Sequence, residues 1–191
     1  MNRVKTYVLS ILLVYSALSY GFDSRANLPE KILPATGTIQ LAFTPGDDAA
    51  GLIIGALNQA QSEVLVQAYS FTHQKIADAL LAAARRGVSV RIIADRSQIK
   101  RMERGLIPYL AAGGLEVYVD AKHDAAHNKL MIIDAREELP IIITGSYNFT
   151  HAAQSRNAEN VLILRGNEGL SRAYRDNWNK HFAHSSPYPH P

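Results

Sequence analysis

Three residue types that can act together on an anionic group lie close together in the second half of the chain. His127 and Lys129 are separated by one residue, and Asp134 follows Lys129 after four apolar residues. A histidine can serve as nucleophile, base or acid near neutral pH, and an adjacent ammonium group attracts negative charge. The spacing therefore indicates chemistry on an anionic group, of which phosphate is the obvious candidate.

The apolar run from Leu130 to Ile133 predicts a buried strand. Alternate side chains of a strand point to opposite faces, so His127 and Lys129 should share one face. Asp134 is an odd number of positions from His127 and should point to the other face. We therefore keep Asp134 in the candidate catalytic motif but expect a structural role, such as anchoring the hairpin or the edge of the sheet.

Further polar residues follow the neighbouring apolar segments. Ser146 and Asn148 repeat the two-residue spacing directly after Gly145, and both side chains can donate a hydrogen bond to a phosphoryl oxygen. The alternative for this segment is a turn that caps a helix. Glu159 directly precedes another apolar run, where it can orient an imidazole ring or simply be solvated at the end of a strand.

The elements that must position these residues alternate between strands and helices. Helical spacing and turn signals predict helices that begin near Pro45 and Thr72, a weaker helix over 97–112 that breaks near Pro108, and a closing helix over 169–182. The strands expected from apolar runs are 38–43, 64–68, 88–94, 115–119, 129–133, 141–144 and 160–164, with 129–133 and 141–144 forming a hairpin. This order predicts an α/β sheet with helices on its faces in one domain over 38–184.

The motif His127-x-Lys129-x4-Asp134, followed by Gly145-Ser146-x-Asn148, resembles the HKD motif of the phospholipase D superfamily. The resemblance covers roughly residues 38–182, and it fixes five residue types over about twenty positions. It implies a mixed β-sheet flanked by helices. The size and the single motif make the chain similar to the small single-motif bacterial endonucleases of that superfamily.

The resemblance also implies a reaction and a set of roles. Larger members carry two such motifs, so a chain with one motif is expected to form a homodimer whose two His127 side chains meet in one site. One His127 attacks phosphorus to form a phosphohistidine, and the partner's His127 protonates the leaving oxygen and then activates water. Lys129 and Asn148 hold the phosphoryl oxygens, Ser146 supports the phosphate site, and Glu159 sets the tautomer of His127. No metal and no cofactor is implied.

Other histidines and basic residues leave alternatives open. His123 or His151 can supply the acid within one chain, which would remove the need for a dimer. No His-x3-His or His-x2-carboxylate spacing on a helix is present, so we predict no catalytic metal. The basic residues that could contact a phosphate backbone, or could simply be solvated, are Arg85, Arg86, Arg91 and the cluster from Lys100 to Arg104.

Both ends of the chain differ from the middle. Residues 1–21 have the layout of a secretory signal peptide, with an uncleaved N-terminal anchor as the alternative, and residues 22–37 are expected to be a leader or linker. We expect a periplasmic or secreted protein without stable membrane association after cleavage, and a disordered tail over 185–191. The chain has no cysteine, which excludes disulfides and thiolate sites. Without Arg3 and Lys5 it keeps 18 basic against 17 acidic residues, so charge alone does not indicate a nucleic-acid partner.

Three functions remain at this point. The first is an endonuclease without sequence preference that cuts DNA, with RNA as a second candidate substrate. The second is a phospholipase D or phosphatidyl transferase with the same histidine chemistry, which should show an apolar entry surface that the sequence does not indicate. The third is a non-catalytic module that binds nucleic acid or lipid, and the intact His, Lys, Asn and Glu set argues against it.

Overall fold

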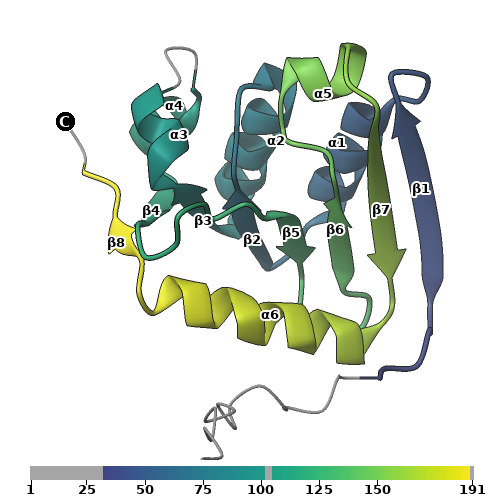
Figure 1. Ribbon diagram of the computed structural model, residues 1–191. Coiled ribbons are helices and arrows are strands. Elements are labelled where there is room, and N and C mark those ends of the chain that lie inside the picture. Colours follow the sequence, from purple (N-terminus) through teal and green to yellow (C-terminus); the bar gives the residue numbers. More distant parts are fainter. Residues whose placement is uncertain (1–31, 102–104, 190–191) are drawn as a thin grey trace, which may run out of the picture. The chain divides into compact units, whose positions relative to one another are not determined.

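Eight strands form one hydrogen-bonded sheet in the order β1-β7-β6-β5-β2-β3-β4-β8 (Figure 1). The computed structural model describes residues 32–101 and 105–189, and those from Leu33 onward form a single unit. The predicted signal peptide, most of the leader or linker and the last two residues of the tail lie outside the described residues. In the part of the chain that is described, no helix combines the length and the apolar character needed to cross a membrane.

The order of elements follows the predicted alternation closely. The strands are β1 (Thr38–Thr44), β2 (Glu63–Ala68), β3 (Ser89–Asp95), β4 (Glu116–Asp120), β5 (Lys129–Ile133), β6 (Ile141–Gly145), β7 (Glu159–Arg165) and β8 (Ser186–Pro187). The helices are α1 (Ala49–Gln59), α2 (Gln74–Arg85), α3 (Arg96–Arg101), α4 (Ile107–Ala112), α5 (His151–Ser155) and α6 (Glu168–Phe182).

The sheet combines a parallel half with an antiparallel half. Strands β2, β3 and β4 run parallel, with α2 in the first crossover and α3 and α4 in the second. Strands β5, β6, β7 and β1 are joined to β2 and to one another by antiparallel pairs, which include the predicted hairpin β5–β6. The prediction of an α/β fold with a mixed sheet flanked by helices is confirmed.

Alternating side chains divide the core between the two faces of the sheet. On one face, Val66 and Met131 pack with the apolar sides of α1 and α2. On the other face, Leu65 and Ile132 pack against α6 through Trp178. Figure 1 shows α6 running across the strands on the side away from α1 and α2. This period-two division is what the apolar strand pattern requires when both faces are covered.

The closing helix is fixed to the centre of the sheet by Trp178. Its ring is fully buried, stacks on Phe182 at 5.1 Å between centroids, and donates from Nε1 to the Val66 carbonyl at 3.1 Å. The guanidinium of Arg91 lies 5.1 Å from the Trp178 ring and pairs with Glu63 at 2.7 Å. The guanidinium of Arg91 therefore packs against the core on this face of the sheet and is engaged by Glu63, so it is not free to contact a phosphate backbone.

Two local predictions differ from the structure. The predicted helix over 97–112 is two helices, and Pro108 lies in the first turn of α4, where its missing N–H costs nothing, rather than at a break. Residues of the predicted disordered tail are ordered in part: Ser186 and Pro187 form β8 beside β4, and Tyr188 N–H donates to the Val117 carbonyl at 2.8 Å. The backbone groups of the edge strand β4 bind this segment, and that explains its order.

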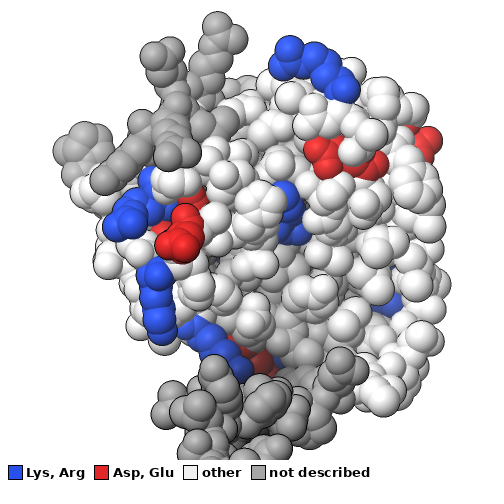
Figure 2. Space-filling model, in the orientation of Figure 1, with Lys and Arg blue, Asp and Glu red and all other residues white. Residues whose placement is uncertain are grey.

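Strand β1 presents an apolar row to solvent. Ile39, Leu41 and Phe43 alternate along the strand and are 60%, 52% and 59% exposed. Helix α6 covers the middle of this face of the sheet but contributes no partner to these side chains. Figure 2 shows few charged side chains over β1 and β7, at the right of the view. The row reaches the end of β1 where Phe43 pairs with Asn160.

Candidate active site

The candidate catalytic residues gather where β2 ends and β5 begins. Lys129, the first residue of β5, lies opposite Ala68, the last residue of β2. A hydrogen bond joins the loop that precedes β5 to the end of β3: Asp95 Oδ2 accepts from the Ala126 N–H at 2.7 Å. The sheet therefore fixes the main chain on both sides of His127, which itself is exposed.

His127 and Lys129 lie on the same face, as the strand period predicts. Lys129 Nζ is 3.0 Å from His127 Nδ1 and donates to the His127 carbonyl at 2.7 Å. An ammonium group has only donors, so Nδ1 accepts and the ring proton belongs on Nε2, a tautomer inferred here from the contacts. The exposed ring can thus present Nε2–H to an incoming oxygen while its other nitrogen is held by a cation.

Tyr69 completes the surroundings of this pair. Its ring centroid lies 4.8 Å from Lys129 Nζ and 4.3 Å from the His127 ring, and its N–H donates to the Asn128 carbonyl at 3.0 Å. Lys129 is buried, and burial lowers its pKa while the negative charge of Glu159 opposes part of that shift. The sequence interpretation missed Tyr69, although an aromatic residue directly after β2 becomes a neighbour of Lys129 once β2 and β5 are paired.

Gly145 directs Ser146 and Asn148 toward the same region. Its φ is +150°, and a Cβ on this residue would lie 2.2 Å from the Asn160 carbonyl oxygen, so only glycine allows β6 and β7 to approach here. The two aromatic residues that alternate with Ser146 and Asn148 are buried, which leaves Ser146 exposed and Asn148 half-buried. Asn148 Oδ1 is buried and has no hydrogen-bond partner among the described residues, and because an amide oxygen only accepts, a phosphoryl oxygen would have to bind at Nδ2.

Glu159 contacts Ser146 rather than His127. Its Oε2 accepts from Ser146 Oγ at 2.6 Å, and its Oε1 accepts from Asn157 Nδ2 at 3.0 Å. The expected hydrogen bond from Glu159 to His127 Nδ1 is replaced by the contact with Lys129. In this structure Glu159 therefore holds Ser146 in place and supplies negative charge near Lys129.

Asp134 lies at the other end of β5, about 17 Å along the strand from Lys129. It is buried, and its carboxylate accepts from the N–H groups of Gln61, Ser62 and Glu63 at 2.8–3.0 Å and from Ser62 Oγ at 3.1 Å. Its own φ is +53°, so the strand ends at the preceding residue and the parity argument does not apply to it. Asp134 anchors the start of β2 to the hairpin, in agreement with the expected structural role, and it does not reach the reacting atoms.

Replacing Asp134 with asparagine should lower stability without changing the chemical step. Asparagine tolerates the positive φ but loses the charge and one acceptor, and it leaves part of the N–H cluster unpaired. We expect the free energy of unfolding to fall by about 2–4 kcal/mol. Urea unfolding measures this loss, and kcat per folded molecule should stay within about twofold of the wild type. A folded, fully assembled variant without turnover would contradict the structural assignment.

The other histidines named from the sequence are engaged elsewhere. His151 stacks on His73 at 4.5 Å between centroids, and His123 Nδ1 lies 3.1 Å from Asp120 Oδ2. Burial, followed by the charge of His151, lowers the pKa of His73. The structure therefore does not bring His123 or His151 to His127 as a second acid within one chain.

The basic residues proposed for phosphate contact divide in a similar way. Arg86 donates to the Leu57 carbonyl at 2.8 Å, where it ties α2 to α1, while Arg85 is exposed at the end of α2. Residues 102–104 and the side chains of Lys100 and Arg101 lie outside the described residues. The cluster at 100–104 therefore stays a prediction.

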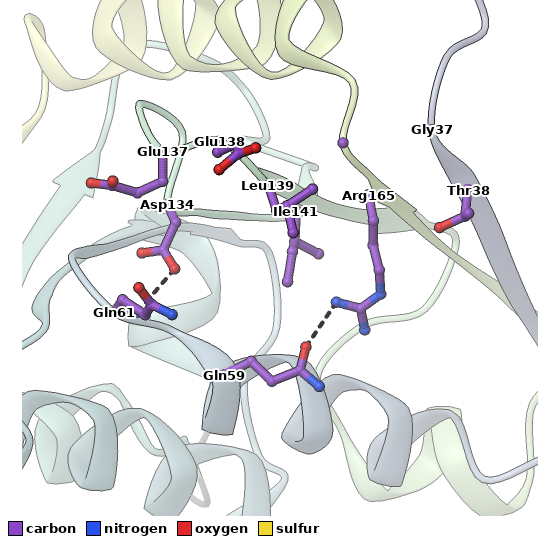
Figure 3. A pocket seen from close by; sticks show the side chains of 11 residues that line it. Gly37, Thr38, Gln59, Gln61, Asp134, Glu137, Glu138, Leu139, Ile141 and Arg165 are labelled. Carbon is purple, nitrogen blue, oxygen red and sulfur yellow. Dashed lines mark hydrogen bonds between the residues drawn. The ribbon is translucent and has the colours of Figure 1, made fainter.

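A cavity lies at the end of the sheet opposite His127. It has a volume of about 780 Å³ and opens at the Asp134 end of the sheet, where Arg165 donates to Gln59 at 3.1 Å (Figure 3). Asp134, Glu137 and Glu138 line it, so its charge disfavours an anionic ligand. The candidate catalytic residues lie on the open surface around His127 and do not line this cavity.

An exposed imidazole held by a buried ammonium, with serine and asparagine donors from the next strand, defines an α/β enzyme that acts on phosphate esters. Three comparisons name its family. Residues 53–184 match the family model described as cardiolipin synthase, PLD-like domain. A protein of Rickettsia typhi named phospholipase D is 34% identical over 177 residues, which cover 86% of this chain and 84% of that protein. Human mitochondrial cardiolipin hydrolase is 30% identical over 156 residues, which cover 77% of this chain and 60% of that protein.

The chain belongs to the phospholipase D superfamily, and it is a phosphodiester hydrolase. Its structure is similar to that of Nuc from Salmonella typhimurium, a phospholipase D family member. The TM-score is 0.74 with 28% identity, and the match covers 80% of this chain and 99% of Nuc.

Proposed function

We propose that this protein is an endonuclease that cleaves DNA, and RNA as a second substrate, through a phosphohistidine and without a catalytic metal. The observation that carries the proposal is the buried ammonium of Lys129, held 3.0 Å from the exposed imidazole of His127. Among the described residues no carboxylate forms an ion pair with Lys129, and a buried lysine of this kind is costly unless it binds an anion that arrives from outside. A bound phosphoryl group supplies that anion.

The reaction proceeds in two displacements at phosphorus. In the first, an imidazole nitrogen of one His127 forms a bond to phosphorus while the bond to the leaving oxygen breaks, and the partner's His127 gives its Nε2 proton to that oxygen. In the second, water attacks phosphorus, its proton passes to the partner's His127, and the phosphorus–nitrogen bond breaks. Lys129 and Asn148 stabilise the charge on the non-bridging oxygens. The acid must be the doubly protonated imidazolium and the attacking His127 must present an unprotonated nitrogen, so the two copies carry different numbers of protons when the reaction begins.

A second copy of the chain supplies the second histidine. One chain contributes one His127, while His123 and His151 are held at Asp120 and His73. The second copy can pack on the apolar row of β1. This row begins at the catalytic edge, the edge of the sheet that carries His127, because Phe43 pairs with Asn160 and the Asn160 N–H donates to Ser146 Oγ. A C2 pair brings two equal His127 side chains together in one site.

Mixing subunits tests the shared site. If each site needs both His127 side chains, an equal and random mixture of wild-type and His127→Ala chains should retain about one quarter of the wild-type specific activity. Independent monomers would retain about one half. The assay requires that the mixture be unfolded together and refolded, with sedimentation to show that the chains are paired. Retention of one half by paired chains would rule out a shared site.

Nucleic acid is favoured over phospholipid by two observations. The fold matches Nuc over nearly the whole of that chain, so it carries the nuclease-like core without a large addition. Exposed cations also lie on segments that meet at the catalytic edge, at Lys75, Arg96, Lys122 and Arg156, although Asp47 and Asp48 lie at the β1 end of the same edge. A polyanion that runs past His127 can contact several of these cations at once.

Cleavage of supercoiled plasmid in excess EDTA tests the function. Nicking by the purified protein that survives the chelator, and that is lost in His127→Ala, is the expected result. Fluorescence of the one tryptophan, Trp178, shows in parallel that the protein stays folded. The names of the Rickettsia and human relatives support the rival substrate, so headgroup release from phosphatidylcholine or cardiolipin vesicles is measured alongside. Folded protein that releases headgroup and leaves plasmid intact would overturn the nuclease proposal. Export to the periplasm or medium is part of the proposal and rests on residues 1–21.

A further inference from the structure

Three imidazole rings converge on one carboxylate at the end of β4. The Asp120 side chain is fully buried, and its Oδ2 lies 3.0 Å from His181 Nδ1, 3.1 Å from His123 Nδ1 and 3.2 Å from His184 Nε2. His123 belongs to the loop before β5, whereas His181 and His184 lie at the end of α6 and just beyond it. One ligand atom from each of the four residues lies within 4.8 Å of all the others.

The distances from Asp120 Oδ2 to the three ring nitrogens resemble those between ligands of a tetrahedral metal ion. Zinc binds imidazole nitrogen and carboxylate oxygen at about 2.0–2.2 Å, which places two ligand atoms of a tetrahedral site about 3.3–3.5 Å apart. The three distances from Asp120 Oδ2 are close to that range. The donor set of one carboxylate and three imidazoles also suits zinc and its neighbours among the divalent transition metals.

Hydrogen bonds alone account poorly for the arrangement. A carboxylate oxygen offers about two lone-pair positions, yet three ring nitrogens lie within 3.2 Å of Asp120 Oδ2, and of these only His123 Nδ1 also lies near Oδ1, at 3.3 Å. The other oxygen, Oδ1, already accepts from the Lys122 N–H at 3.0 Å. A cation among the four side chains would accept a lone pair from each of them. The carbonyl end of α6, a helix of 15 residues, adds a dipole that favours positive charge at this position.

We propose that Asp120, His123, His181 and His184 form a binding site for one zinc ion. With four protein ligands the coordination sphere is closed, so the ion has a structural role. The histidine side chains are 17–43% exposed, which lets the ion enter from solvent without opening the core. His127 is not a ligand, because its Nδ1 is bound by Lys129.

The ion would join the C-terminal helix to the catalytic loop. The segment from Ala121 to Asn128 contains both His123 and His127, and it is held at its far end by the contact between Asp95 and Ala126. Zinc supplies a second anchor at His123, so opening of this loop requires release of the metal or rupture of that contact. The role is independent of which phosphodiester the enzyme cleaves.

Metal content and thermal unfolding test the site without an activity assay. The full chain is stripped with EDTA, dialysed against zinc chloride and then against buffer, and its zinc is measured by mass spectrometry. We expect one zinc per chain and a rise in melting temperature of about 5–10 °C when free zinc is about 100 times Kd. Cobalt in place of zinc should give the strong visible absorption of a four-coordinate ion.

Variants decide whether these four side chains are the ligands. The pair His181→Gln and His184→Gln should lose both the bound zinc and the stabilisation. His123→Gln changes a side chain that is 43% exposed, so it should fold and bind zinc at least tenfold more weakly. His151→Gln, outside the cluster, and His127→Ala should keep one zinc per chain. Wild-type protein that takes up no zinc, or a ligand variant that binds like the wild type, would overturn the proposal and leave a hydrogen-bonded cluster.

Discussion

Replacing His127 with alanine should lower the rate of phosphodiester cleavage by more than about 10⁴-fold. In the proposed mechanism the imidazole forms the bond to phosphorus and, from the partner subunit, protonates the leaving oxygen. One substitution therefore removes both roles from a shared site. Stability should change little, because the side chain is exposed and its ring is bound by Lys129 alone among the described hydrogen bonds.

The matched control for this variant is His151→Ala. His151 is also an exposed histidine near the catalytic edge, but it stacks on His73 and contacts no reacting group in the proposed mechanism. We expect its rate to remain within about threefold of the wild type. Single-turnover kinetics on a labelled oligonucleotide measures both variants. A His127→Ala protein that retains a few per cent of the wild-type rate would show that another residue acts as nucleophile.

Lys129→Met should lower kcat by about 10²–10³-fold while stability is kept or raised. Methionine fills a similar volume and removes a charge that is buried against Tyr69. The transition state then loses its nearest cation, whereas the folded state no longer bears the cost of desolvating an ammonium group. A variant that loses activity because it unfolds would lower both the rate and the melting temperature, so an opposite movement of the two separates loss of the cation from loss of the fold.

The pH dependence of the wild type follows from the same burial. The pKa of Lys129 is lowered in the folded protein, mainly by desolvation, so the ammonium is lost below the pH at which an ordinary lysine titrates. Activity should therefore fall on the alkaline side earlier than the usual lysine pKa predicts. Between the lowered folded pKa and the usual unfolded value the unfolded chain binds more protons, so stability rises with pH in that window. Lys129→Met should lack this rise, and equal pH profiles for the two proteins would contradict it.

Most strands of the sheet and the pair of His127 and Lys129 were predictable, because they depend on the spacing of residues that are close in the sequence. Apolar runs of four to seven residues marked β1 to β7, and the two-residue offset placed His127 and Lys129 on one face. Tyr69 and Glu159 were harder, because their neighbours depend on pairings between distant strands. Tyr69 meets Lys129 through the register of β2 and β5, and Glu159 meets Ser146 through that of β6 and β7.

Asp134 and the cluster at Asp120 show two further limits of prediction from the sequence. Strand parity predicted a structural role for Asp134, but parity does not apply to it, because its positive φ ends the strand at the preceding residue. Asp134 lies away from His127 because it is at the other end of β5. The cluster at Asp120 consists of two pairs, each with two residues between its members, that lie about sixty positions apart. No local sequence pattern relates the two pairs. They come together only because α6 and β8 pack beside β4.

The order of elements along the chain also determines when the protein can fold. β1 is the first strand, yet its neighbour is β7, with Thr38 opposite Arg165. Trp178, which covers the second face of the sheet, lies in the last helix. A chain is synthesised from its N-terminus. Strand β1 therefore stays unpaired, and the face of the sheet that Trp178 covers stays uncovered, until nearly the whole chain has emerged. Such distant pairings form slowly, so the native sheet cannot be completed until the segment from β7 to α6 has been synthesised.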